Sequence, residues 1–279
     1  MVKTAIVTDS TAYLEADVRK KHDVHMIPLQ VTFGLESFEE EGELTFQEFY
    51  AKAETELPKT SQPPIGEFIH LYEQLAEDYD EIVSIHLSSG ISGTFSGSVQ
   101  AGQLAGNVEV FTFDSEISCA MQGFYALEAA EMAQQGAGAR EILTRLDKMK
   151  ESMRGYFMVE DLKHLQRGGR LSGAQAMVGG MLQIKPLLHF RNTMIVPFEK
   201  VRTRKKAMNR MAALLEADAR AGVPIKASII HANREEDAIR WRKELELQFT
   251  SVEFDISYFG PVIGTHLGEG AMGLGWVKK

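Results

Sequence analysis

The sequence predicts an α/β protein with two domains, a mainly parallel sheet in the first and a mixed sheet in the second. In the first half, short β-prone runs end in Ser, Thr, Asp or Gly, and helical patterns separate them. Strands that alternate with helices in this way form βαβ units and a parallel sheet. The chain has 279 residues, which is longer than one hydrophobic core usually supports. A second domain is therefore expected.

Three strands are predicted in the N-terminal half, within "TAIVTDST" (4–11), "EIVSIHLSSGISGT" (81–94) and "VEVFTFDSEIS" (108–118). With flanking helices they predict a Rossmann-like, mainly parallel sheet. Ligands of such sheets bind outside the carboxyl ends of the strands. In this sequence those ends are rich in hydroxyl groups.

One helix is predicted in "PPIGEFIHLYEQLAED" (63–78), because its apolar residues recur at the spacing of one helix face. Thr60 and Ser61 precede Pro63 and Pro64. Hydroxyl residues and proline are typical of a helix start, so we expect Thr60 and Ser61 to cap this helix.

The C-terminal half has a different pattern, which favours an α+β domain with a mixed sheet and helices to one side. A tight connection at Arg191–Asn192 suggests a hairpin, and helical stretches are expected near 203–221 and 234–248. The predicted strands lie within "YFMVED" (156–161), "PLLHF" (186–190), "TMIVPFE" (193–199), "KASIIHA" (226–232) and "SVEFDIS" (251–257). We place the boundary near "MKESMRGYF", which gives domains of 1–156 and 157–279.

Composition excludes several classes of protein. No apolar run approaches the ~20 residues that a membrane-spanning helix needs, and we expect neither a signal peptide nor stable membrane insertion. The single cysteine, Cys119, excludes an internal disulfide. The net charge of −9, divided as −15 over residues 1–156 and +6 over 157–279, argues against nucleic acid as a partner. These features indicate a cytoplasmic protein.

The sequence contains none of the common cofactor-binding or metal-binding motifs in a suitable context. "GEGAMG" (268–273) matches G-x-G-x-x-G, but too few residues follow it for a dinucleotide-binding fold. No P-loop motif occurs, and the eight histidines include no H-E-x-x-H pair. We therefore expect no metal and no cofactor.

The segment "HLSSGISGTFSGS" (86–98) carries six hydroxyls and three glycines between a predicted strand and a predicted helix. Such a loop presents free backbone N–H groups and the positive end of the helix dipole. Capping and a tight turn explain one or two of the hydroxyls, but an anion site explains all of them better. Because the loop holds no Arg or Lys, a carboxylate fits it better than a phosphate does.

A hydrolase is the second hypothesis. "GISGT" (90–94) is one residue short of the G-x-S-x-G nucleophile elbow, so Ser92 is the candidate nucleophile of an esterase or thioesterase. His266 would be its base and Asp114 would orient the base. Against it, Thr94 stands where the last glycine belongs, and no HGGG-type segment precedes the loop. A sugar-phosphate or nucleotide-phosphate binder is a third possibility.

Seven segments occur in an order that resembles the DegV family of bacterial fatty-acid-binding proteins. They are "TDST", "TSQPP", "SSGISGT", "FDSEISCAMQGF", "HLQRGGRLSG", "KVRTRKKA" and "GPVIGTHLGEGAMG". The resemblance covers essentially the whole chain. It implies two α/β domains, a buried long-chain fatty acid as ligand, and a non-enzymatic carrier. It also implies a partner, the fatty acid kinase subunit, which would convert the presented carboxylate into acyl-phosphate for phospholipid synthesis.

The resemblance also implies residue roles. It places the fatty-acid carboxylate on the hydroxyls of Thr60 and Ser92 and beside the backbone of Gly93 and Thr94. Arg170 and His266 match positions near the head group. From the residues alone, the small side chains between Ser172 and Ile184 indicate close packing of helix and sheet, and the alternative is that they leave room for a ligand.

A basic cluster, "KVRTRKKAMNR" (200–210), is the expected docking patch for the kinase. The resemblance singles out Arg202, and Arg204 and Lys205 lie beside it. Asp9 and Asp114 end predicted strands near the presumed crevice. Each is expected either to cap a helix or to orient Thr60 or His266.

Overall fold

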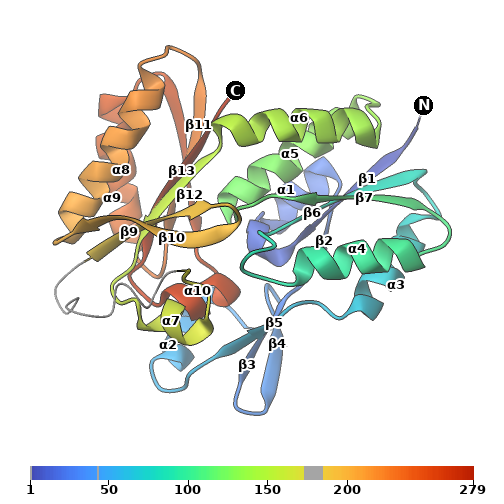
Figure 1. Ribbon diagram of the computed structural model, residues 1–279, viewed down its shortest axis with the longest axis horizontal. Coiled ribbons are helices and arrows are strands. Elements are labelled where there is room, and N and C mark those ends of the chain that lie inside the picture. Colours follow the sequence, from blue (N-terminus) through green and yellow to red (C-terminus); the bar gives the residue numbers. More distant parts are fainter. Residues whose placement is uncertain (1, 43, 173–184) are drawn as a thin grey trace.

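The computed structural model describes residues 2–42, 44–172 and 185–279, which fold around two main sheets and one small sheet. One main sheet belongs to the N-terminal half and the other to the C-terminal half (Figure 1). The two-domain α/β fold expected from the sequence is confirmed.

The N-terminal sheet has four strands in the order β2-β1-β6-β7, all parallel. Helices α3 and α4 cover one face, and α1, α5 and α6 cover the other. The strands are β1 (Thr4–Asp9), β2 (Val24–Ile27), β6 (Glu81–His86) and β7 (Glu109–Asp114). The helices are α1 (Ala16–His22), α3 (Ile65–Leu75), α4 (Thr94–Leu104), α5 (Ala120–Gln134) and α6 (Ala139–Ser152). Every residue of β1 is buried, as expected for a strand that helices cover on both faces.

The C-terminal sheet has six strands in the order β10-β9-β8-β13-β11-β12, of which only β11 and β12 pair in parallel. The strands are β8 (Arg154–Met158), β9 (Lys185–Arg191), β10 (Met194–Val201), β11 (Ile225–His231), β12 (Val252–Tyr258) and β13 (Met272–Lys278). Helices α8 (Arg204–Ala219) and α9 (Glu235–Gln248) pack on one face, as predicted. The predicted division at residues 156 and 157 falls inside β8.

The predicted hairpin joins β9 and β10, but its turn lies one residue later than expected. Asn192 and Thr193 have φ values of 49° and 66°. Two successive residues with positive φ are typical of a type I′ turn, whose twist matches that of paired strands. At this turn the carbonyl of Thr193 accepts a hydrogen bond from Ser88 Oγ at 2.6 Å, so the tip of the hairpin contacts the loop after β6.

A small antiparallel sheet in the order β4-β3-β5 was not predicted. It consists of β3 (Gln30–Phe33), β4 (Glu36–Glu39) and β5 (Lys59–Ser61), and α2 (Phe46–Ala53) lies between β4 and β5 in the chain. Thr60 pairs with Val31 in this sheet. Helix α3 begins at Ile65, and no side chain of the described residues caps it. The prediction that Thr60 and Ser61 cap α3 is therefore wrong, because strand pairing uses this segment instead.

Three further helices are short: η1 (Ser10–Ala12), α7 (Lys163–Gly168) and α10 (Pro261–Leu267). Helices α7 and α10 pack against each other, and α10 also contacts α2, β3 and β5. Within the described ranges, no helix combines the length and the apolar character that a membrane span requires.

Candidate functional site

A cavity of about 330 Å³ lies at the carboxyl ends of the parallel strands, between the two main sheets. Segments that follow β6 and β7 form one wall, and β8, β13 and α10 form much of the other. The volume falls at the lower end of the range for small-molecule sites. The cavity is where the parallel-sheet rule predicted a ligand site.

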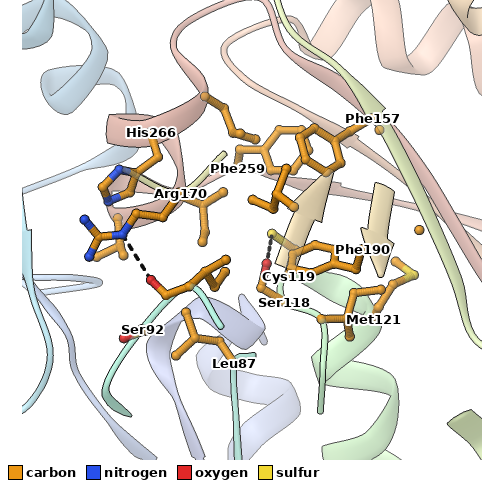
Figure 2. A pocket seen from close by; sticks show the side chains of 18 of the residues that line it. Leu87, Ser92, Ser118, Cys119, Met121, Phe157, Arg170, Phe190, Phe259 and His266 are labelled. Carbon is orange, nitrogen blue, oxygen red and sulfur yellow. Dashed lines mark hydrogen bonds between the residues drawn. The ribbon is translucent and has the colours of Figure 1, made fainter. Parts of the chain in front are cut away.

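Most of the cavity is apolar. Figure 2 shows Leu87, Met121, Phe157, Phe190 and Phe259 around it, on segments from both halves of the chain. Four of these five side chains are at least 94% buried, and the fifth, Phe190, is partly buried. Such walls offer no hydrogen bonds, so they favour a hydrocarbon occupant.

Glycines on two neighbouring strands create part of this space. A Cβ on Gly275 of β13 would lie 2.1 Å from Met121 Sδ, and one on Gly155 of β8 would lie 2.8 Å from Ile117 Cδ1. The two glycines pair with each other across the strands. The absence of their side chains lets Met121 and Ile117 approach the sheet and leaves the cavity beside them open.

The opposite end of the cavity is polar. Thr60 Oγ1 lies 2.9 Å from His266 Nε2, although 206 residues separate them in the chain. Ser92, Arg170 and His266 lie at the same end, as Figure 2 shows, and all three are partly exposed. The structure thus brings together Thr60, Ser92, Arg170 and His266, the four side chains that the family resemblance implied for a head group.

Ser92 and Gly93 line the cavity at the start of α4, where Gly93 takes the N-cap position. The Ser92 hydroxyl lies 2.8 Å from Thr94 Oγ1 and accepts a bond from the Thr94 N–H at 3.3 Å. Thr94 is fully buried and lies behind Ser92. Its contact with the cavity is therefore indirect, through the orientation of the Ser92 hydroxyl.

Arg170 contributes the positive charge of this end. Its Nε donates to the Ile91 carbonyl at 3.1 Å, and its guanidinium also donates to the Gly168 carbonyl. These contacts fix the side chain and use two of its five donors. The others can bind an anion.

His266 is held in its neutral form. Burial and, to a smaller extent, electrostatic repulsion from Arg170, Arg167 and His164 together lower its pKa to about 4. Its Nδ1 is buried and finds no hydrogen-bond partner among the described residues. A neutral imidazole beside a threonine hydroxyl can orient that hydroxyl without adding charge.

Asp9 and Asp114 support the strand-end loops and do not orient the head-group residues. Asp9 accepts the Leu87 N–H at 2.9 Å and lies 3.1 Å from His86 Nδ1, and its side chain also caps η1. Asp114 accepts the N–H groups of Ser89 and Glu116. The expectation that one of them orients Thr60 or His266 is wrong, because neither carboxylate contacts those side chains, and helix capping is confirmed for Asp9.

The candidate esterase residues are not arranged as a triad. His266 Nε2 contacts Thr60, the Ser92 hydroxyl contacts Thr94, and Asp114 binds backbone N–H groups. A nucleophile needs its base within hydrogen-bond reach. In this structure the closest hydroxyl partner of His266 is that of Thr60.

Sequence reasoning missed two features of the cavity. Gln62 lines its polar end, close enough that a Cβ on Gly93 would lie 2.0 Å from Gln62 Oε1. Ser118 and Cys119 line its middle, with Ser118 Oγ 3.4 Å from Cys119 Sγ. Burial raises the pKa of Cys119 to about 12. Ser118 and Cys119 follow β7 as the hydroxyl loop follows β6, and this equivalent position could have identified them as cavity residues.

The predicted docking cations divide into two kinds. Arg202 and Lys205 are exposed, whereas Arg204 is partly buried and lies 3.0 Å from Glu160 and 3.5 Å from Asp237. Arg204 also donates to the Gly270 carbonyl, so it holds the start of α8 in place. Of the segment Ser172 to Ile184, whose small residues were expected to pack closely or, alternatively, to leave room for a ligand, residues 173–184 lie outside the described residues.

Comparison with known proteins agrees with this architecture. Protein DegV of Bacillus subtilis is 57% identical over 278 residues, which cover 99% of each chain. The crystal structure of DegV, a fatty acid binding protein from Bacillus subtilis, superposes over the whole of both chains with a TM-score of 0.96 and 55% identity. A fatty-acid-binding DegV family protein from Thermus thermophilus has a TM-score of 0.93 and 28% identity, covering 99% of this chain and 100% of that one. The DegV family model matches residues 3–279, and the chain therefore belongs to the DegV family.

Proposed function

We propose that this protein is a carrier that buries one long-chain fatty acid, with its acyl chain in the apolar cavity and its carboxylate at the polar end. The main support for the proposal is that one cavity of about 330 Å³ has both apolar walls and a polar end. Solved DegV proteins from Bacillus subtilis and Thermus thermophilus, which are described as binding fatty acids, support the same ligand class.

The energetics support this ligand. Burying about fourteen methylenes at ~0.8 kcal/mol each provides on the order of 11 kcal/mol of gross driving force. Losses of translational and conformational freedom reduce this, which leaves affinities in the micromolar to nanomolar range. A buried carboxylate without partners would cancel the gain. The hydroxyls of Thr60 and Ser92, the start of α4 at Gly93 and the guanidinium of Arg170 supply the donors.

We propose further that a separate fatty acid kinase subunit phosphorylates the bound carboxylate, and that the acyl-phosphate serves phospholipid synthesis in the cytoplasm. The partial exposure of Ser92, Arg170 and His266 supports this, since a partner can reach the carboxylate there. On this proposal the protein itself is not a catalyst. The exposed cations Arg202 and Lys205 would contact the kinase.

Native mass spectrometry of the purified protein, followed by denaturing extraction and lipid analysis, tests the ligand. One co-purified C14–C18 acid in near-stoichiometric amount is the expected result. A protein that is empty and also fails to bind added palmitate or oleate would overturn the carrier proposal.

Two other experiments separate the competing functions. A fluorophosphonate probe would label Ser92 in an esterase but leaves it unmodified in a carrier. Phosphorylated metabolites would raise the melting temperature of a phosphate binder, whereas a fatty-acid carrier is stabilised by oleate.

A further inference from the structure

The first turn of α10 is completed by side chains from a distant part of the chain. Its N-cap is Gly260, which has no side chain, and Pro261 has no N–H. The next two N–H groups donate outward, from Val262 to Glu40 Oε1 at 2.7 Å and from Ile263 to the Tyr13 hydroxyl at 3.3 Å. Two N–H groups that have no partner within the helix are thereby satisfied, and both acceptors come from residues more than 200 positions earlier.

Glu40 is a buried carboxyl group whose pKa is raised by burial to about 8, and its hydrogen-bond partners among the described residues are Val262, Tyr13 and Ser10. Besides Val262, it accepts hydrogen bonds from the hydroxyls of Tyr13 at 2.9 Å and Ser10 at 2.7 Å. Glu40 is only 2% exposed. Burial of a carboxyl group is costly unless it is hydrogen-bonded, and an apolar residue of similar volume often stabilises a fold as well or better. Helix packing alone therefore does not explain Glu40.

The other end of α10 reaches the head-group end of the cavity. His266 lies one turn after Val262 and Ile263, and all three line the cavity. The helix has only seven residues, so a shift of its first turn moves His266 as well. We propose that Glu40, together with Tyr13, is a positioning residue that fixes α10 so that His266 meets Thr60 and the ligand carboxylate. This inference rests on the proposed fatty-acid binding.

The test compares wild type with Glu40→Ala and with Tyr13→Phe, which removes only the hydroxyl that caps Ile263. Palmitate affinity is measured by calorimetry, and the pKa of His266 by NMR titration of the apo protein, with His266→Gln to assign the signal. The matched control is Tyr72→Phe. The Tyr72 hydroxyl is also buried, bonded to Ser84 and Ser98, but it lies on α3 away from the cavity.

We expect Tyr13→Phe and Glu40→Ala to weaken palmitate binding roughly 2- to 30-fold, which is the cost of a lost helix cap expressed as affinity. We also expect the pKa of His266 to rise from about 4 toward its ordinary value, because a displaced His266 regains water. Tyr72→Phe should lower the melting temperature but change neither the palmitate affinity nor the pKa of His266.

Three results would overturn the inference: wild-type affinity in Tyr13→Phe, an unchanged pKa of His266 in that variant, or an equal loss of affinity in Tyr72→Phe. If Glu40→Ala does not fold, Tyr13→Phe still decides. A wild-type protein that binds neither palmitate nor oleate would contradict the proposed function instead. In that case the pKa of His266 in the variants still tests whether Glu40 and Tyr13 position α10.

Discussion

At the scale of single residues, the contact between Thr60 and His266 defines the polar end of the cavity. We expect Thr60→Val, which keeps the shape but removes the hydroxyl, to weaken fatty-acid binding by about 10- to 100-fold. A hydrogen bond to a charged group contributes about 1.5–3 kcal/mol, and a factor of ten in affinity corresponds to about 1.4 kcal/mol. Calorimetry with oleate measures the change.

Thr32→Val is the control for that prediction, because Thr32 belongs to the same small sheet and its hydroxyl contacts Ser37 away from the cavity. It should bind oleate as wild type does. Equal losses in both variants would show that the small sheet, and not the Thr60 hydroxyl, controls affinity.

His266 predicts a pH dependence of stability. Its folded pKa of about 4 lies below its ordinary value of 6.5, so the unfolded chain takes up a proton first as the pH falls. The contribution of His266 to the stability of the apo protein is therefore fully present above pH 6.5, and it is lost as the pH falls from 6.5 to 4. The slope is at most about 1.4 kcal/mol per pH unit.

Urea unfolding of wild type and His266→Gln at several pH values between 7.5 and 4 measures this effect. The free energy of unfolding of the variant should decline less steeply over the acidic range, since glutamine does not titrate. Parallel curves for the two proteins would contradict a depressed pKa for His266.

At the scale of elements, β13 forms part of the cavity wall through a residue without a side chain. Gly275→Ala would place a methyl group 2.1 Å from Met121 Sδ and push Met121 into the cavity. We expect the variant to fold and to bind stearate more weakly, with a smaller effect on laurate, because the longer chain needs more of the lost volume. A competition assay between stearate and laurate measures the ratio of their affinities.

Met121→Ala in the same chain provides the matched test. Removing the displaced side chain should restore stearate binding in the Gly275→Ala background. Equal losses for stearate and laurate, or no rescue by Met121→Ala, would mean that Gly275 serves the sheet and not the cavity.

At the scale of the whole molecule, the ligand site and the expected kinase contact are separate surfaces. Arg202 is exposed and does not line the cavity. Arg202→Ala should therefore keep oleate affinity while reducing the rate of acyl-phosphate formation by the kinase. Coupled kinase assays and calorimetry distinguish the two effects.

Arg220→Ala is the control on the far end of α8, where Arg220 pairs with Glu216. It should change neither affinity nor rate. A loss of oleate affinity in Arg202→Ala would assign Arg202 to the ligand site, and an unchanged rate would place the kinase contact elsewhere.

The sequence predicted most of the elements, since their signals are local. The periodic apolar residues of α3 and the β-prone runs of β1, β6 and β7 were sufficient for their assignment. The small sheet escaped prediction because β5 has only three residues and pairs with β3 about thirty positions earlier. Its local sequence, a hydroxyl pair before two prolines, resembles a helix start.

The sequence by itself determined the fold class, the hydroxyl-rich strand ends and, through ordered motifs, the family. Only the tertiary structure decided which hydroxyls face the cavity: Ser92 does, whereas Thr94 lies behind it. It also revealed that Asp9 and Asp114 hold loops and that Glu40 caps α10. Hydrogen-bond geometry and burial depend on contacts between distant segments, and no local pattern in the sequence encodes them.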